Sequence, residues 1–176
     1  SGKDNYYQGA FTVFLVSFVY WLVHYSYHNN DSWFGFLHRH IHHSDVKYGL
    51  LVDLFSELFL VACPPLVLVL AISYAFQALT DFSLVDTSVA VAFMAYVTLY
   101  HYLGYHWLIP EPNNHAYHHQ DNNTYFSPIH WDLVMNTIDK SASLNGESAL
   151  PTYVFMVIAG LATRIRREQI LFSHHQ

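Results

Sequence analysis

Three histidines in the stretch NNHAYHH, residues 113–119, form an H-x-x-H-H pattern that could bind a metal ion. They are His115, His118 and His119. Imidazole is a common metal ligand at neutral pH, and helical residues three or four apart share one face. A hydrated surface patch of histidines would show the same pattern, so the triplet alone is only a moderate indication of a metal site.

The other histidines strengthen this indication because they are grouped. Of the 14 histidines, six fall in residues 24–43, six in residues 101–130 and none in residues 44–100. Two clusters separated by apolar sequence predict two half-sites that folding brings together. His174 and His175 lie outside both clusters and are interpreted as a solvated tail.

The spacing within each cluster indicates which rings act together. His24 and His28 are four residues apart, so on an α-helix both rings can reach one ion. Any single histidine is more commonly a hydrogen-bonded core or interface residue, but burying so many polar rings near a bilayer without a shared partner would be costly. Because one ion takes about four to six ligands, nine or ten candidates predict two ions. The candidate ligands are His24, His28, His38, His42, His43, His101, His106, His115, His118 and His119, with His40 and His130 less certain as ligands or as residues that orient them.

The composition is that of a membrane protein. The 176 residues, most simply one domain, are 53% hydrophobic, 18% aromatic and 11% charged, against about 25% charged in an average soluble domain. Lys and Arg total 7 against 13 acidic residues, and no basic run is interleaved with aromatics, which excludes nucleic acid as a partner. Cys63 is the only cysteine, so a disulfide framework and a thiolate site are excluded, and a metal must be held by nitrogen and oxygen.

The apolar runs predict the helices that position the histidines. Residues 9–27 contain no charged side chain and approach the about 20 residues that cross the hydrocarbon core, so they form the first crossing. Pro64 and Pro65 should end or kink a helix, so residues 50–62 are predicted as a separate interfacial or buried helix. Residues 65–79 and 87–108 form a hairpin of two crossings. Residues 149–162 form a short apolar C-terminal helix that is interfacial or re-entrant.

The expected architecture is an all-α integral membrane domain, residues 1–176, with about three to four membrane-embedded helices and a histidine-rich metal cap. The hairpin places both histidine clusters, residues 28–48 and 101–138, on the same membrane face. A soluble all-helical protein with buried apolar runs is the less favoured alternative. The positive-inside rule assigns this face to the cytosol or its equivalent, because six cations accompany it: Arg39, Lys47, Lys140, Arg164, Arg166 and Arg167.

Several segments together resemble the fatty acid hydroxylase and sterol desaturase superfamily of membrane di-iron enzymes. In order they are HYSYH, LHRHIHHSD, Glu57, HYLGYH and HAYHHQDNNTYFSPIHWDLVMNTI, and the similarity covers roughly residues 9–138. The resemblance implies a helical membrane domain with a cytosolic metal cap, two iron ions, molecular oxygen as oxidant and a lipid substrate reached from the bilayer. Zinc could replace iron in an imidazole-rich site. Glu57, Asp121, Asn123 and Asp132 are candidates for orienting the ligand rings, with a helix cap or a solvated loop as the alternative role for each.

The chain departs from the family pattern at three points. Arg39 stands where the first H-x-x-H-H triplet of the family begins, so the pattern is stretched to His38, His42 and His43. A one-residue helix bulge would restore the aim of His38, and loss of a ligand is the alternative. The GT that follows WD in the family is Asn136-Thr137 here, and the crossings that usually precede the first motif are reduced to one.

The function expected from the resemblance is hydroxylation or desaturation of a lipid, either fatty acyl, sterol, sphingoid or carotenoid, by an oxygen-dependent di-iron oxidoreductase. Its membrane would be the endoplasmic reticulum, an organelle or the bacterial inner membrane. No heme, flavin or nicotinamide signature is present, so electrons would come from an external donor such as a cytochrome b5 or ferredoxin with its reductase. The alternative is a non-catalytic structural subunit of a larger membrane complex that retains the fold. A zinc hydrolase is weaker, because such sites use about three protein ligands and an open position.

Overall fold

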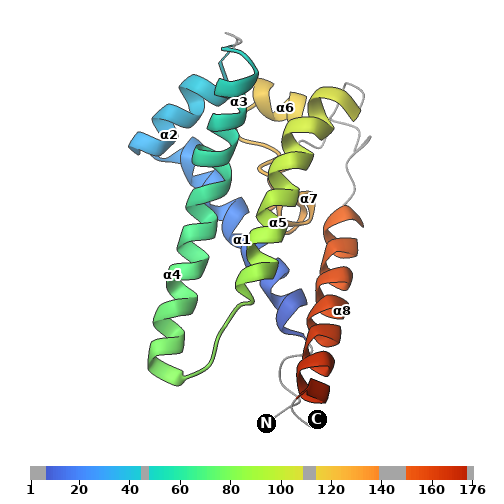
Figure 1. Cartoon of the computed structure of the whole chain (residues 1–176). Coiled ribbons are helices and arrows are strands. Elements are labelled where there is room, and N and C mark those ends of the chain that lie inside the picture. Colours follow the sequence, from blue (N-terminus) through green and yellow to red (C-terminus); the bar gives the residue numbers. More distant parts are fainter. Residues whose placement is uncertain (1–6, 45–47, 109–113, 139–149, 174–176) are drawn as a thin grey trace.

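The computed structural model describes residues 7–44, 48–108, 114–138 and 150–173, and the regular structure within them is helical throughout. Four helical rods run alternately up and down one axis (Figure 1). They are α1 (Gln8–Asn29), then α3 (Leu50–Ser56) with the π-helical η2 (Glu57–Ala62) and α4 (Cys63–Thr80), then α5 (Thr87–Leu99) with the π-helical η3 (Tyr100–Leu108), and finally α8 (Leu150–Ser173). The all-α prediction is confirmed.

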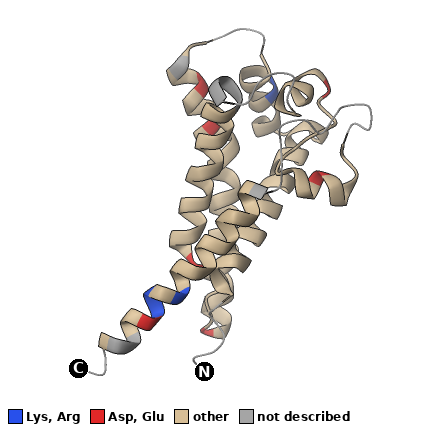
Figure 2. Ribbon diagram, turned by 90° about the vertical axis from the view of Figure 1, so that its right-hand side faces the viewer, with Lys and Arg blue, Asp and Glu red and all other residues tan. Residues whose placement is uncertain are grey.

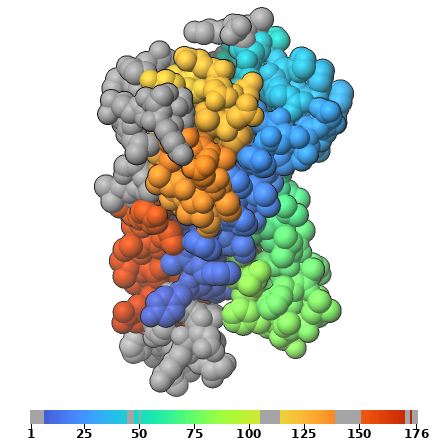
Figure 3. All heavy atoms as spheres, turned by 180° about the vertical axis from the view of Figure 1, so that it is seen from behind, coloured from blue at the N-terminus to red at the C-terminus, as the bar shows by residue number. Residues whose placement is uncertain are grey.

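The short elements lie on the bundle toward one end, here named the histidine end. They are α2 (Trp33–Leu37), the π-helical η1 (His38–His42), α6 (Asn114–Gln120) and α7 (Ile129–Met135). The view from behind shows the segment that contains α7 packed on α1, below α6 (Figure 3). The opposite end, the distal end, comprises the start of α1, the α4–α5 connection and the last turns of α8 (Figure 1).

The bundle is built around α1, which packs against α4, α5 and α8. Val13, Val16 and Tyr20 of α1 are buried with Val69 of α4 and Phe93 of α5. Burial of such side chains contributes about 1.5–3 kcal/mol each relative to leaving them exposed. This core holds the C-terminal turn of α1, with His24 and His28, in a fixed position relative to the other rods.

The rod that contains Pro64 and Pro65 is one continuous helical run, so the prediction of a separate helix at residues 50–62 is wrong. Proline cannot donate a backbone hydrogen bond, and its ring clashes with the carbonyl four residues earlier. The wider π turn of η2 immediately precedes the two prolines, and the Cys63 N–H bonds the Leu58 carbonyl five residues back. The change of helical register therefore accommodates the prolines without a break.

The C-terminal helix is longer than residues 149–162. Apolarity ends near Ala162, but α8 continues to Ser173. Arg164 and Glu168 form an ion pair one turn apart at 3.0 Å on this extension, a spacing that stabilises helices. Hydropathy therefore underestimates the length of the helix.

The extension of α8 carries three arginines to the distal end, which corrects the predicted distribution of cations. Arg166 pairs with Asp86, and Arg166 and Arg167 line a cavity with Gln8 and Asp81. Of the six cations expected on the face of the histidines, Arg39 lies there, Lys47 and Lys140 fall outside the described residues, and Arg164, Arg166 and Arg167 are distal. The positive-inside argument for a cytosolic histidine end therefore no longer holds.

Two helices of the described residues are long and apolar enough to cross a membrane, Gln8–Asn29 and Leu51–Thr80. Their outward faces carry exposed apolar side chains such as Phe14, Val67 and Leu79. The described charges of the four rods lie toward their ends, with Asp53 and Glu57 at the histidine end and the acidic and arginine residues of α8 at the distal end (Figure 2).

Candidate metal centre

Among the described side chains, nine histidines from four separate parts of the chain meet at the histidine end. The last turns of α1 supply two, the η1 region three, η3 one and α6 three. Folding thus brings the two sequence clusters together into one site, here named the histidine centre. Its members are His24, His28, His38, His42, His43, His101, His115, His118 and His119.

The stretched spacing of the first cluster is matched by a local change of helix type. Residues His38–His42 form a π-helical turn, and the His43 N–H bonds the His38 carbonyl at 3.3 Å. A π turn holds about one more residue than an α turn, so residues five apart can share a face. The bulge that would restore the aim of His38 is therefore present, and His38 joins His43 in one group.

Arg39, which stands at the position of the expected histidine, points elsewhere. Its guanidinium donates to the carbonyl oxygens of Tyr27 and Asn30, at the C-terminal end of α1. Positively charged side chains stabilise such carbonyls at helix ends. Arg39 therefore fastens η1 to the end of α1, beside the turn that carries His28.

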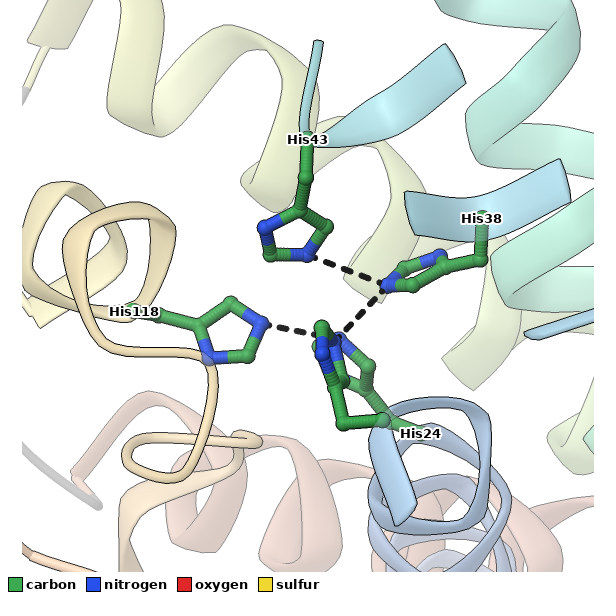
Figure 4. Close-up of side chains that lie close together, drawn as sticks. His24, His38, His43 and His118 are labelled. Atoms are coloured by element: carbon green, nitrogen blue, oxygen red, sulfur yellow. Dashed lines mark hydrogen bonds between the residues drawn. The ribbon is translucent and has the colours of Figure 1, made fainter. Parts of the chain in front are cut away.

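The first group of the centre contains five histidines, whose ligand atoms all lie within 4.8 Å of one another. They are His24, His28, His38, His43 and His118. The Nε2 atoms of His28 and His43 each lie 3.2 Å from His38 Nε2, and His118 Nε2 lies 3.2 Å from His24 Nε2. Figure 4 shows the rings of His24, His38, His43 and His118 pointing their nitrogens at a common centre.

Backbone carbonyls determine the tautomers of two of these rings. His24 Nδ1 lies 2.7 Å from the Phe126 carbonyl oxygen, and His118 Nδ1 lies 2.5 Å from the Thr124 carbonyl oxygen. A carbonyl can only accept, so both Nδ1 atoms carry the proton and donate it. In the neutral ring the Nε2 atom then carries a lone pair.

The contact between His24 and His118 tests whether a metal ion fits. Burial, with His28 nearby, lowers the pKa of His118 well below its usual 6.5, so that ring is neutral. When the His24 ring is neutral as well, two Nε2 lone pairs face each other at 3.2 Å, and neutral rings in these tautomers cannot form a hydrogen bond there. Two nitrogens about 2.0–2.1 Å from one ion and about 100° apart lie about 3.2 Å from each other. The donor set of the first group fits a metal ion.

The remaining histidines surround a buried carboxylate. His42 forms one group with His43 and His119, and another with His101 and His115. Glu57 Oε1 lies 2.9 Å from His42 Nδ1 and 3.5 Å from His101 Nε2. Glu57 is buried, and among the described residues neither its Oε2 atom nor His42 Nε2 has a hydrogen-bond partner. Carboxylates that accept from a ring nitrogen commonly orient metal-binding histidines, so Glu57 leaves His42 Nε2 available for an ion.

Asp132 supports the loop that supplies the two carbonyls. Its carboxylate accepts from the backbone N–H groups of Phe126 and Ser127 at 2.9 Å, from Trp21 Nε1 at 2.9 Å and from Thr137 Oγ1 at 2.7 Å. Burial raises the pKa of Asp132 to about 6, and these hydrogen bonds oppose the rise. At neutral pH the carboxylate is thus ionised and can accept all four hydrogen bonds.

Four of the less certain candidates lie away from the centre. His40 is exposed, stacks on Phe36 and bonds the Phe36 carbonyl at 3.0 Å. His130 lies beside Trp131 and Tyr153 and belongs to none of the histidine groups. Asp121 accepts from the Asn123 backbone N–H at 3.1 Å and thereby shapes an exposed turn. Asp121 and Asn123 therefore have the solvated-loop role that was the alternative to orienting a ligand ring. The His106 side chain, His174 and His175 lie outside the described residues.

Several residues of the site carry no signal that identifies them from sequence. Thr124 and Phe126 act through backbone carbonyls, which every residue possesses. Trp21 and Thr137 matter only because folding brings them to Asp132. Asn114, by contrast, stands beside the triplet, and its buried amide nitrogen and oxygen have no partner within the part of the chain that the structure describes. Because helical residues four apart share a face, the position of Asn114 four residues before His118 is a sequence signal that its amide lies near that ring.

Comparison with known proteins adds no assignment to this geometry. No protein-family model, curated protein sequence or solved structure matches the chain. The site consists of several groups of buried and half-buried histidines, at one end of an apolar helical bundle, that could hold metal ions.

Proposed function

We propose that the chain is a membrane di-iron oxidoreductase that hydroxylates or desaturates a lipid with molecular oxygen. The observation that carries the proposal is the facing pair of Nε2 lone pairs on His24 and His118 within a centre of nine histidines. Nitrogen-only donor sets suit iron and also accept zinc. The resemblance of the histidine motifs to the fatty acid hydroxylase and sterol desaturase superfamily supports iron and oxygen chemistry.

The donors divide into two sets that suit two ions. The group of His24, His28, His38, His43 and His118 would hold one ion. The two groups that share His42, one with His43 and His119 and one with His101 and His115, would hold the other. Bound iron would supply the activation of oxygen needed to break an unactivated C–H bond. Hydroxylation consumes oxygen, two electrons and two protons and yields an alcohol and water, whereas desaturation yields an alkene and two waters. The electrons would come from an external donor such as a cytochrome b5 or ferredoxin with its reductase.

The residues around the rings prepare the centre for an ion. The Thr124 and Phe126 carbonyls keep the Nδ1 protons of His118 and His24 on the side away from the other ring. Glu57 does the same for His42. A site whose ligands are oriented before binding loses less conformational freedom when an ion arrives.

The surface of the bundle supports a position in a bilayer. Within the described ranges, two helices are long and apolar enough to cross a membrane, and the described charges of the rods lie near their two ends (Figure 2). Apolar side chains exposed on α4, such as Val67, Tyr74 and Leu79, would contact lipid. We place the histidine centre near one membrane surface, where a lipid chain and a soluble electron donor can both approach it.

The alternative function is a structural subunit that keeps the fold, with or without the ions, and has no turnover. The observation that favours it is Arg39, which replaces a family histidine and fastens two helices together. The enzyme and the structural subunit are distinguished by turnover. Metal content alone does not separate them.

The test is oxygen-dependent product formation by purified protein in lipid nanodiscs. The chain is loaded with ferrous iron, supplied with a reductase system and a mixed lipid extract, and incubated under ¹⁸O-labelled oxygen. We expect iron to bind and a lipid product to form, carrying ¹⁸O if it is an alcohol. His118→Ala should abolish both, whereas His40→Ala, a matched change at an exposed ring, should preserve both. Bound iron with no product would favour the structural subunit, and absence of bound metal would contradict the di-iron enzyme.

A further inference from the structure

A groove lies between α5 and α8, outside the histidine centre. It has a volume of about 260 Å³ and apolar walls that include Val89 and Ala92 of α5 and Phe155, Ile158 and Ala162 of α8. Small-molecule pockets commonly measure about 300–1,000 Å³, so the groove has room for part of a long molecule. The small side chains of Ala92 and Ala162 leave this space between the two helices.

The groove leads to a polar cavity at the distal end. This cavity has a volume of about 520 Å³, and Ser88 and Arg166 line both spaces. Its other walls include Arg167, Gln8, Gln77 and Asp81. An apolar groove that joins a polar cavity matches an amphipathic ligand, one with a long apolar chain and a polar head.

The charges of the cavity indicate the kind of head. Asp86 is buried and already accepts from the Ser88 and Val89 N–H groups and from Arg166. Arginine is suited to phosphate because its planar guanidinium offers parallel donors. Arg166 and Arg167 therefore suit a phosphate, and the carboxylate of Asp81 adds a partner for an ammonium group.

The surroundings indicate where such a ligand comes from. Ile158 lines the groove and is exposed, and Ile165 of the same helix is exposed as well, so in a bilayer they would contact lipid chains. We propose that this α5–α8 site binds one membrane phospholipid with a zwitterionic head. One acyl chain lies in the groove, and the phosphate lies at Arg166 and Arg167. The site is distinct from the entry of any substrate to the histidine centre, and it rests on the membrane position of the bundle but not on oxygen chemistry.

The experiment is native mass spectrometry of the full chain in detergent, titrated with phosphatidylethanolamine or with diacylglycerol of the same acyl chains. We expect one phosphatidylethanolamine to bind and diacylglycerol to bind much more weakly. Arg167→Gln leaves the Arg166–Asp86 pair intact. It should weaken lipid binding about fivefold, because each arginine near a lipid surface strengthens binding by about that factor. Ala162→Phe should fill the groove and reduce binding of the lipid.

The matched control is Arg164→Gln. Arg164 lies on the same helix, pairs with Glu168 and lines neither the groove nor the polar cavity. We expect this variant to bind phosphatidylethanolamine as the unchanged chain does. Equal binding of the two lipids, or unchanged binding by both Arg167→Gln and Ala162→Phe, would overturn the proposal. Loss of binding in the control as well would show that surface charge, and not this site, retains the lipid.

Discussion

The indole of Trp21 donates a 2.9 Å hydrogen bond to Asp132, joining residues 111 positions apart in the chain. Trp21 lies one helical turn before His24 on α1, and Asp132 holds the loop whose Phe126 carbonyl accepts from His24. The same carboxylate thus connects both sides of the first histidine group, although its described hydrogen bonds go to Trp21, Phe126, Ser127 and Thr137 and to no histidine ring.

Asp132→Asn should weaken metal binding without removing a ligand. The amide would place an N–H donor against the Ser127 N–H, which now donates to a carboxylate oxygen at 2.9 Å. Loss of residues that orient ligands commonly lowers metal affinity about 10–100-fold, and an unsatisfied buried donor costs about 1–3 kcal/mol. Metal titration and thermal unfolding measure the two effects. Asp121→Asn, in an exposed turn, is the control, and equal metal affinity in both variants would contradict the positioning role.

His38→Ala should lower metal occupancy, whereas His40→Ala should not. His38 is buried with its Nε2 atom 3.2 Å from those of His28 and His43, while His40 is exposed and stacks on Phe36. Loss of a residue that only orients a ligand lowers metal affinity about 10–100-fold. We expect His38→Ala, which removes a ligand, to lower metal affinity by more than this. Plasma emission analysis of metal per chain makes the measurement. The reverse order of effects would show that the π turn at residues 38–42 does not direct His38 into the centre.

The metal-free protein should lose stability as the pH falls below about 6.5. Burial lowers the pKa values of His38, His115 and His118 well below their usual 6.5, so below that pH the unfolded chain binds more protons than the folded one. Stability is then greatest above about pH 6.5 and declines toward the lowered pKa values. Thermal unfolding between about pH 8 and pH 5 should show the decline, less steeply for His118→Gln. The exposed His40→Gln is the control, and a pH-independent midpoint would contradict the expectation.

Gly9→Val should destabilise the packing of α1 on α8. A Cβ atom at Gly9 would lie 2.5 Å from Thr163 Oγ1 and 2.6 Å from the Ala159 carbonyl oxygen, closer than real contacts allow. Overpacking of this kind commonly costs about 1–3 kcal/mol. Gly160→Ala is the matched control, since its Cβ would meet only Ala10 Cβ at 3.9 Å. Unfolding midpoints in detergent compare the two, and equal midpoints would argue against a close crossing of these helices.

Labelling of single cysteines should show which membrane side each end of the bundle faces. In a Cys63→Ala background, cysteines at Asn30 and Asn122 lie on exposed loops of the histidine end, and one at Asp81 lies at the distal end. An impermeant thiol reagent on sealed vesicles should label the first two from one side and the third from the other. Labelling of Asn30 and Asn122 from opposite sides would contradict the bilayer placement of the bundle.

The grouping of the histidines is the part of this molecule that sequence spacing could anticipate. Repeats of three and four residues point side chains to one helix face, and the structure places His24 and His28 with His118 of the other cluster. The stretched first triplet was interpretable for the same reason, because a π turn at His38 restores a shared face.

Other features depend on neighbours that spacing does not encode. Pro64 and Pro65 favour a helix end, yet packing of the buried Leu60, Val61 and Ala62 keeps the rod continuous. The apolar run of the sequence ends near Ala162, yet α8 continues to the distal end through charged residues with good helix propensity. The Thr124 and Phe126 carbonyls could not be foreseen, since a backbone oxygen has no residue type.

The placement of His42 and His43 has a consequence for how metal would load. His43 belongs to the five-membered first group and also to the group of His42 and His119, while His42 also belongs to the group of His101 and His115. An ion in one group would immobilise a ring that borders the next, so the two binding free energies are linked, and the linkage is reciprocal. Loading would then follow a cooperative isotherm, with few half-filled chains at intermediate metal concentration. Replacing His43 should separate the curve into two independent steps.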